Sequence, residues 1–218
     1  ERKFWKDDFS VDSSSQYTRD VGRFTWDTAN SQLLVTGVGK IIRPDTFGAN
    51  IYKLTVTPNT TSYYHLGFCL YNPTTGQYQH VGLYSIGTSY YARASGEIIT
   101  SVSGAVTHTL GQPVTITFDA TDPTAAVCRI KCTGGQVSTL KFNLVAKGIN
   151  TTGEWRVGLS VSDSSWANAT IKDFTCIPSI SYADDFSTDT TERYRSPVNV
   201  GSSVAYDSVN KKVNVTLT

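Results

Sequence analysis

Two neighbouring stretches carry the aromatic and basic side chains that could bind a ligand. Residues 63–71 and 77–85 alternate apolar and polar positions around an Asn72-Pro73-Thr74-Thr75-Gly76 turn, which predicts a β-hairpin. An antiparallel register that starts at the turn pairs Tyr71 with Tyr78, Cys69 with His80, Gly67 with Gly82 and His65 with Tyr84. The other face is apolar, and a one-residue slip would bury the histidines, so this register is favoured.

A third strand extends the outward face of this hairpin. If the chain turns at residues 86–88, Tyr91 lies beside Gly82 and Arg93 lies beside His80. The candidate ligand-binding residues are then Tyr71, Tyr78, Tyr84, Tyr91, His65, His80 and Arg93, around a dip at the two glycines. Aromatic rings cover the apolar face of a sugar, and polar tips bind its hydroxyl groups, but the same rings serve protein interfaces. Alternatively, cross-strand tyrosine pairs only stabilise an exposed sheet.

The chain has four cysteines, and two kinds of chemistry are open to them. A neighbouring His80 could lower the pKa of the Cys69 thiol, although a structural or disulfide role is favoured. Cys128 and Cys132 lie on one strand about 13 Å apart, too far to bridge each other. A disulfide between Cys176 and one of that pair is geometrically plausible. The alternative is that all four cysteines are buried thiols.

Aspartates near both ends of the first repeat could bind a metal ion. Asp7 and Asp8 open the chain's first strand and Asp173 lies on its last. These two strands often neighbour each other in a sandwich, and calcium prefers carboxylate and carbonyl oxygens. Calcium is therefore a possible, not a required, cofactor. The alternative is that Asp7 and Asp8 cap a turn while Asp173 is solvated.

Composition narrows the classes of partner and the cellular location. Charged residues make up 17% of the chain and the formal net charge is +1, which argues against nucleic acid as a partner. No apolar run is long enough to insert into a membrane as a helix. Glycosylation sequons occur at Asn59, Asn150, Asn168 and Asn214. Together with the even number of cysteines they favour an extracellular or cell-surface protein.

The elements that must position these residues are strands. Apolar and polar residues alternate at period two between turns, and no helical stripe is present, which predicts an all-β fold of two packed antiparallel sheets. The predicted strands are residues 23–27, 32–36, 51–57, 63–71, 77–85, 89–94, 114–119, 126–132, 139–145, 154–161 and 169–177.

Several segments between residues 7 and 177 resemble one superfamily. They are Thr109-Leu110-Gly111-Gln112 before residues 114–118, the strand 126–132 closing at Gly134-Gly135, and residues 154–159 before residues 169–174. They are similar to the later strands of the concanavalin A-like, laminin-G-like superfamily, and the Asp-Asp-Phe opening is similar to its first strand. The resemblance implies a jelly-roll β-sandwich and says little about function.

Glycosidases of this superfamily typically carry a Glu-x-Asp-x-Glu or Glu-x-Asp-x-x-Glu run on one strand. This chain departs from that pattern, because Glu97 and Glu154 are far apart and neither has an acidic partner at the required spacing. The sequence also has no G-x-S-x-G motif. On these grounds we expect that the chain is not an enzyme, with polysaccharide hydrolysis or lysis as the least favoured alternative.

The opening motif occurs twice. Asp7-Asp8-Phe9-Ser10 recurs as Asp184-Asp185-Phe186-Ser187, and the match continues to the segment 213–216 with an offset that grows from 177 to 180 residues. Residues 1–178 therefore form one sandwich unit, and residues 179–218 hold the first strands of a second, which is incomplete and possibly donates a strand. The favoured function is a noncatalytic structural or adhesive repeat that contacts copies of itself or neighbouring units. The alternative is a carbohydrate-binding module.

Overall fold

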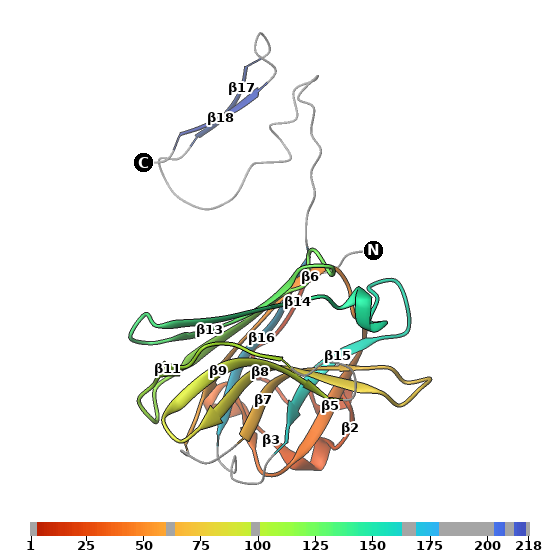
Figure 1. Cartoon of the computed structure of the whole chain (residues 1–218), viewed down its shortest axis with the longest axis vertical. Helices are drawn as coiled ribbons and strands as arrows, with labels where there is room; N and C mark the ends of the chain where they lie inside the picture. The colour runs from red at the N-terminus through yellow and green to blue at the C-terminus, as the bar shows by residue number, and fades with distance from the viewer. Residues whose placement is uncertain are drawn as a thin grey trace. The chain divides into compact units, whose positions relative to one another are not determined.

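Two antiparallel β-sheets, packed face to face, form the larger part of the chain in this computed structural model (Figure 1). The structure describes residues 4–59, 64–96, 101–162, 169–178, 203–207 and 212–216. The chain divides into two compact units, Glu1–Ser179 and Ile180–Thr218. No helix in the described residues is long and apolar enough to cross a membrane. The helices among the described residues are short 3-10 turns: η1 (Ser14–Gln16), η2 (Val21–Arg23), η3 (Thr28–Asn30) and η4 (Val145–Lys147).

The first sheet has eight strands in the order β14-β13-β12-β6-β16-β4-β3, and β1 also pairs with β16. Its strands are β1 (Trp5–Asp7), β3 (Phe24–Asp27), β4 (Gln32–Val35), β6 (Asn50–Thr57), β12 (Val114–Asp119), β13 (Ala126–Cys132), β14 (Val137–Phe142) and β16 (Thr170–Pro178). The first and last strands of the sandwich unit are thus neighbours, as expected.

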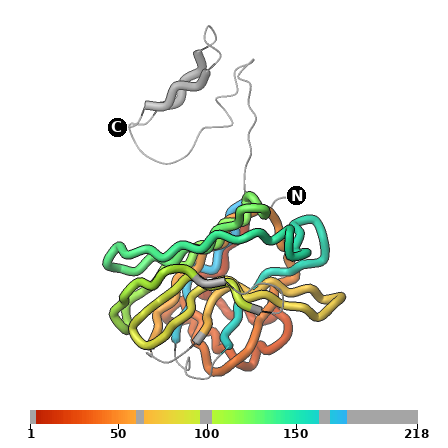
Figure 2. The backbone as a smooth tube through the Cα atoms, viewed as in Figure 1, coloured from red at the N-terminus to blue at the C-terminus, as the bar shows by residue number. Residues whose placement is uncertain are grey.

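The second sheet also has eight strands, in the order β10-β9-β8-β7-β15-β5-β2, with β11 pairing with β9. Its strands are β2 (Thr18–Arg19), β5 (Gly39–Thr46), β7 (Tyr64–Tyr71), β8 (Tyr78–Ile86), β9 (Ser89–Gly96), β10 (Ser101–Val102), β11 (Val106–Thr107) and β15 (Arg156–Val161). Figure 2 follows the chain as it passes between the layers, so that its N-terminal segments contribute strands to both sheets.

The hydrophobic core lies between the sheets. Because side chains alternate along a strand, every second residue of each central strand points inward. Tyr52 on β6 and Phe118 on β12 stack with ring centroids 5.9 Å apart, and Phe68 on β7 meets both from the opposite sheet. All three are fully buried. This burial of aromatic surface is the main force that holds the two layers together.

Each of the eleven predicted strands is present, but the long strand β5 and the two-residue strands β2, β10 and β11 were missed. Pro44 made β5 look unlike a strand in the sequence, because proline cannot donate a ladder hydrogen bond. The pairing of β5 with β15 explains why proline is tolerated: the register shifts between Arg156 and Gly158, opposite Pro44. The short β2 covers β5 only at Ile41 and Ile42.

The second unit contains one hairpin, formed by β17 (Ser203–Asp207) and β18 (Lys212–Thr216). Its register repeats that of β3 and β4. Tyr206 pairs with Val213 as Trp26 pairs with Leu33, and Asp207 pairs with Lys212 as Asp27 pairs with Gln32. The recurrence seen in the sequence is therefore also a recurrence of strand pairing.

Candidate functional site

The hairpin of β7 and β8 has the predicted register, and its outward face carries the predicted residues. The outward pairs are Tyr71 with Tyr78, Cys69 with His80, Gly67 with Gly82 and His65 with Tyr84. The opposite positions, among them Leu66, Phe68 and Leu83, are buried in the core. The apolar set fixed the register, as the period-two argument requires.

The third strand of this face is placed two residues away from the predicted register. Tyr91 pairs with Tyr84 and Arg93 pairs with Gly82, whereas the sequence argument set Tyr91 beside Gly82. The predicted register leaves too few residues for the turn between β8 and β9, because Ile86 pairs with Ser89 and the turn needs Gly87 and Thr88. Gly87 takes the left-handed conformation, φ +61°, that such a tight turn requires. Tyr84 and Tyr91 therefore contact each other directly, with ring centroids 5.7 Å apart.

Gly67 and Gly82, the glycines of the predicted dip, leave no room for a side chain between their strands. A Cβ added to Gly67 would lie 2.6 Å from the Val81 carbonyl oxygen, and one added to Gly82 would lie 2.6 Å from that of Leu66. Only glycine lets the two strands approach so closely. The space around them, bordered by His65, His80 and Arg93 among others, is too small to hold a water molecule.

Two histidines stand beside the dip, each held by a serine. His65 Nδ1 lies 2.8 Å from Ser95 Oγ, and His80 Nδ1 lies 2.5 Å from Ser160 Oγ. Burial, together with the nearby His65 and Lys40, lowers the pKa of His80 to about 3. His80 is therefore neutral at physiological pH, so one ring nitrogen donates and the other accepts.

Three tyrosines of this face each carry a cation over the ring. The Arg19 guanidinium carbon lies 4.4 Å from the Tyr71 ring centroid, Lys40 Nζ lies 3.9 Å from that of Tyr78, and the Arg93 guanidinium carbon lies 4.3 Å from that of Tyr84. Arg19 also donates to the Tyr71 hydroxyl at 2.7 Å. These contacts fix the charged groups in place and stabilise each pair by about 0.5–2 kcal/mol.

Lys40 and Arg19 were not among the predicted site residues. Lys40 lies on the missed strand β5. Arg19 would point inward on a regular strand, but its left-handed backbone, φ +75°, lets its side chain reach Tyr71. The Arg-Asp pair at positions 19–20 before a Val-Gly step was the only local signal of an irregular backbone.

A groove of about 310 Å³ opens on this face beside Lys40, Tyr78 and His80. Its remaining walls are Asp20, Arg23, Val38, Gly39, Val161 and Ser162. Toward the other end of this face, on β9, the Arg93 Nε atom is buried and finds no acceptor among the described residues. A buried donor of this kind is rare in native proteins, where such groups are normally hydrogen-bonded.

The four cysteines are free thiols, which corrects the disulfide prediction. Cys128 and Cys176 lie in one row of the first sheet, but Phe118 and Tyr52 separate them. Three strand spacings amount to about 14 Å, beyond the reach of a disulfide. Burial raises the pKa of Cys69 and Cys128 to about 12 and that of Cys176 to about 11, and it also raises that of Cys132. Cys69 is thus a buried thiol and not a thiolate activated by His80.

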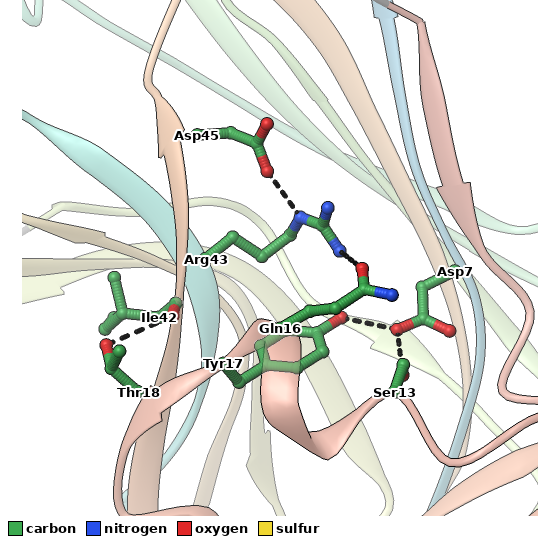
Figure 3. Close-up of polar contacts among 8 residues, drawn as sticks. All are labelled: Asp7, Ser13, Gln16, Tyr17, Thr18, Ile42, Arg43 and Asp45. Carbon is green, nitrogen blue, oxygen red and sulfur yellow. Dashed lines mark hydrogen bonds and ion pairs between the residues drawn. The ribbon is translucent and has the colours of Figure 1, made fainter.

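The aspartates proposed for calcium bind protein donors, and Figure 3 shows this for Asp7. Asp7 Oδ2 accepts hydrogen bonds from Ser13 Oγ at 2.5 Å and from the Tyr17 hydroxyl at 2.8 Å. Asp8 accepts from Ser10, and Asp173 pairs with Lys6 at 2.7 Å. Among the described residues no three His, Cys, Asp or Glu side chains cluster as metal ligands do. Calcium binding here stays a prediction.

The predicted glycosylation sites differ from one another in their structural setting. Asn59 and Asn150 are exposed in loops, Asn214 lies in β18, and Asn168 lies outside the described residues. Glycosylation itself stays a prediction.

Searches of known proteins identify the fold. No protein-family model matches the sequence, and no curated protein matches it. Winged bean acidic lectin, complexed with methyl-α-D-galactose, superposes with a TM-score of 0.58 at 12% identity over 80% of this chain and 98% of the lectin. Bacillus licheniformis β-glucanase gives a TM-score of 0.53 at 11% identity over 81% and 98% of the chains. The fold is therefore a concanavalin A-like jelly roll, as the resemblance implied.

A third similar structure is a larger protein. The GH43B protein of the Bacteroides ovatus xyloglucan PUL superposes with a TM-score of 0.58 at 13% identity over 79% of this chain. This chain spans 39% of its length.

These comparisons correct the prediction that the chain is not an enzyme. That prediction rested on the lack of paired carboxylates on one strand, but glycoside hydrolases share the fold. Acids and bases from different strands can meet above one sheet, so a motif confined to a single strand does not decide the question. The noncatalytic interpretation is withdrawn.

Proposed function

We propose that this protein binds a saccharide on the outward face of its second sheet. The observation that carries the proposal is the buried Arg93 Nε, a donor without an acceptor among the described residues, close to His65 and His80. A hydroxyl or carboxylate oxygen of a ligand would satisfy it. The superposed proteins add support, because their names include a lectin with bound galactoside, a β-glucanase and a protein of a xyloglucan locus.

The chemistry of the face suits a saccharide. Neutral His80 both donates and accepts, as sugar hydroxyl groups do. Half-buried Tyr78 and Tyr91 add phenol groups with apolar rings, and the groove of about 310 Å³ beside Tyr78 and His80 offers room for a sugar ring. Hydrolysis or lysis of the bound saccharide is compatible with this proposal, since binding precedes either reaction.

A polysaccharide panel tests the proposal. Affinity electrophoresis and calorimetry would compare the wild type with a Tyr78→Ala, Tyr91→Ala variant against xylan, xyloglucan, β-glucan, galactan and polygalacturonate. We expect binding to at least one polymer and its loss in the variant. The matched control is Thr115→Ala, Thr139→Ala, at exposed positions of the first sheet, and it should bind as the wild type does. Absence of binding to every polymer, or equal binding by all three proteins, would refute the proposal.

A second function rests on the repeated hairpin. We propose that residues 182–216 begin a second unit of the same kind, whose partner is a neighbouring unit or a second copy of the chain. In the sequence, Asp184, Thr190 and Tyr194 repeat the Asp7, Ser13 and Tyr17 cluster with the hydroxyl groups kept. The equal registers of β3–β4 and β17–β18 support the same conclusion. An extracellular location suits such a repeat and is part of the proposal.

A chimera tests whether the two segments are equivalent. Residues 182–215 would replace residues 5–35 in the full chain. Equivalent segments should give a chimera that unfolds cooperatively and retains near-ultraviolet circular dichroism. A control chimera with one residue deleted between Asp207 and Lys212 shifts the register and should not fold. If the two chimeras behave alike, the segments are not interchangeable and the repeat is one of sequence only.

A further inference from the structure

We infer that the saccharide bound by the outward face is acidic and carries carboxylate or sulfate groups. This inference rests on the proposed function and specifies its ligand. It begins with the faces of the tyrosine rings. Tyr71, Tyr78 and Tyr84 already stack on cations, so these three rings present fixed positive charge where an uncovered ring would stack on a sugar.

Two of the cations lie at the ends of one row of residues. The cross-strand pairs run from Lys40 on β5 to Arg93 on β9, through Ser160, Gly67 and Gly82. The three residues between them have no side chain or a short one. The row crosses four strand spacings, about 19 Å, and has a basic group at each end, while His80 covers its middle through the contact with Ser160. Its length suits a short stretch of a polysaccharide lying across the strands.

The acids that would neutralise these cations are missing from the described part of the face. The salt bridges found among the described residues are Lys6–Asp173 and Arg43–Asp45, and neither involves a cation of the row. The described outward positions of β5, β7, β8, β9 and β15 hold no Asp or Glu. Asp20 does line the groove, where its Oδ2 accepts the backbone N–H of Lys40 at 2.9 Å.

An anionic ligand answers both observations. A partly buried cation is stabilised by a nearby opposite charge, and the attraction is stronger where water is partly excluded. Arginine suits a carboxylate or sulfate because its planar group donates two parallel hydrogen bonds, and Arg93 Nε is the donor that lacks an acceptor among the described residues. A neutral sugar would bring no opposite charge to the cations at the two ends of the row.

The experiment compares charge at this face with charge elsewhere. The test variant is Lys40→Gln, Arg93→Gln. The control is Arg129→Gln, Lys131→Gln, which removes the same charge from exposed positions on the outer face of the first sheet. Both would be titrated with polygalacturonate, alginate, chondroitin sulfate, neutral xylan and galactan, and single-stranded DNA. Thermal unfolding would verify that each variant is folded.

We expect the wild type to bind an acidic polymer in preference to neutral ones, and the test variant to bind it at least about ten-fold more weakly, a loss of 1.4 kcal/mol. The control should bind within about two-fold of the wild type, and 0.5 M NaCl should weaken the wild-type complex because salt screens the attraction. Uronate-only and sulfate-only binding would each support the inference and identify the anion.

Three results would overturn it. Equal or better binding of neutral polymers would refute the acidic ligand while leaving saccharide binding intact. Binding of no polysaccharide would refute both proposals. Equal weakening in the two variants, or equal binding of DNA, would show nonspecific attraction to polyanions. If the test variant fails to fold, the wild-type preference between acidic and neutral polymers and its salt dependence decide the question.

Discussion

Gly67 and Gly82 face each other across β7 and β8, and neither position has room for a Cβ. We predict that Gly82→Ala destabilises the protein by about 1–3 kcal/mol, because the new methyl group would meet the Leu66 carbonyl oxygen and force the strands apart. Chemical denaturation would measure the loss. Gly134→Ala is the control, since nothing lies within 4 Å of its added Cβ. Equal stability of the two variants would contradict the close approach of the strands.

The hairpin that holds these glycines was predictable from the sequence, and the reason is physical. Its inward set, which includes Leu66, Phe68 and Leu83, tolerates only one register, so the outward residues followed. The rest of the site was not predictable in the same way. Lys40 lies on β5, a strand that was not predicted because it contains Pro44. The β8–β9 register depends on the exact length of a turn. Likewise, the sequence shows which face of its own strand each cysteine occupies, but it does not show the order of the strands. That order places β12 and β6 between Cys128 on β13 and Cys176 on β16.

His80 should make the protein less stable in acid. Burial and its neighbours lower its pKa in the folded protein to about 3, whereas an unfolded chain has a histidine pKa of about 6.5. Between these values the unfolded chain binds a proton that the folded chain does not. Stability contributed by neutral His80 is therefore present above pH 6.5 and decreases as the pH falls, by about 2 kcal/mol at pH 5.

His80→Asn tests this pH dependence. Asparagine keeps a polar group near Ser160 but does not titrate, so the variant should lose less stability than the wild type between pH 7 and pH 5. Urea denaturation at both pH values gives the two differences directly. Parallel stability curves for the two proteins would show that His80 is protonated in the folded state or is solvated.

The thiols provide a test of the cysteine geometry. We expect the chain, purified without reductant and unfolded in guanidinium, to react with Ellman's reagent at all four cysteines, because none of them is within disulfide range of another. In the folded protein the reaction should be slow, since burial raises the pKa of each thiol and blocks access. Recovery of only two thiols from the unfolded chain would instead indicate a disulfide.

The repeated Asp-Asp motif contains two aspartates with different roles. Asp7 is buried, and its carboxylate accepts hydrogen bonds from the Phe9 N–H, Ser13 Oγ and the Tyr17 hydroxyl. Asp8 is exposed and accepts only from Ser10 among the described residues.

Asp7→Ala should therefore cost about 3 kcal/mol, because buried donors lose a charged acceptor, while Asp8→Ala should leave the unfolding midpoint almost unchanged. Thermal denaturation with and without calcium would measure both variants and the wild type. A midpoint of the wild type that rises with calcium and falls with EDTA, with the response lost in both variants, would support the predicted metal site. Without a calcium response, the loss in Asp7→Ala alone would identify Asp7 as the acceptor that joins β1 to Ser13 and Tyr17. Equal losses in the two variants would contradict this assignment of roles.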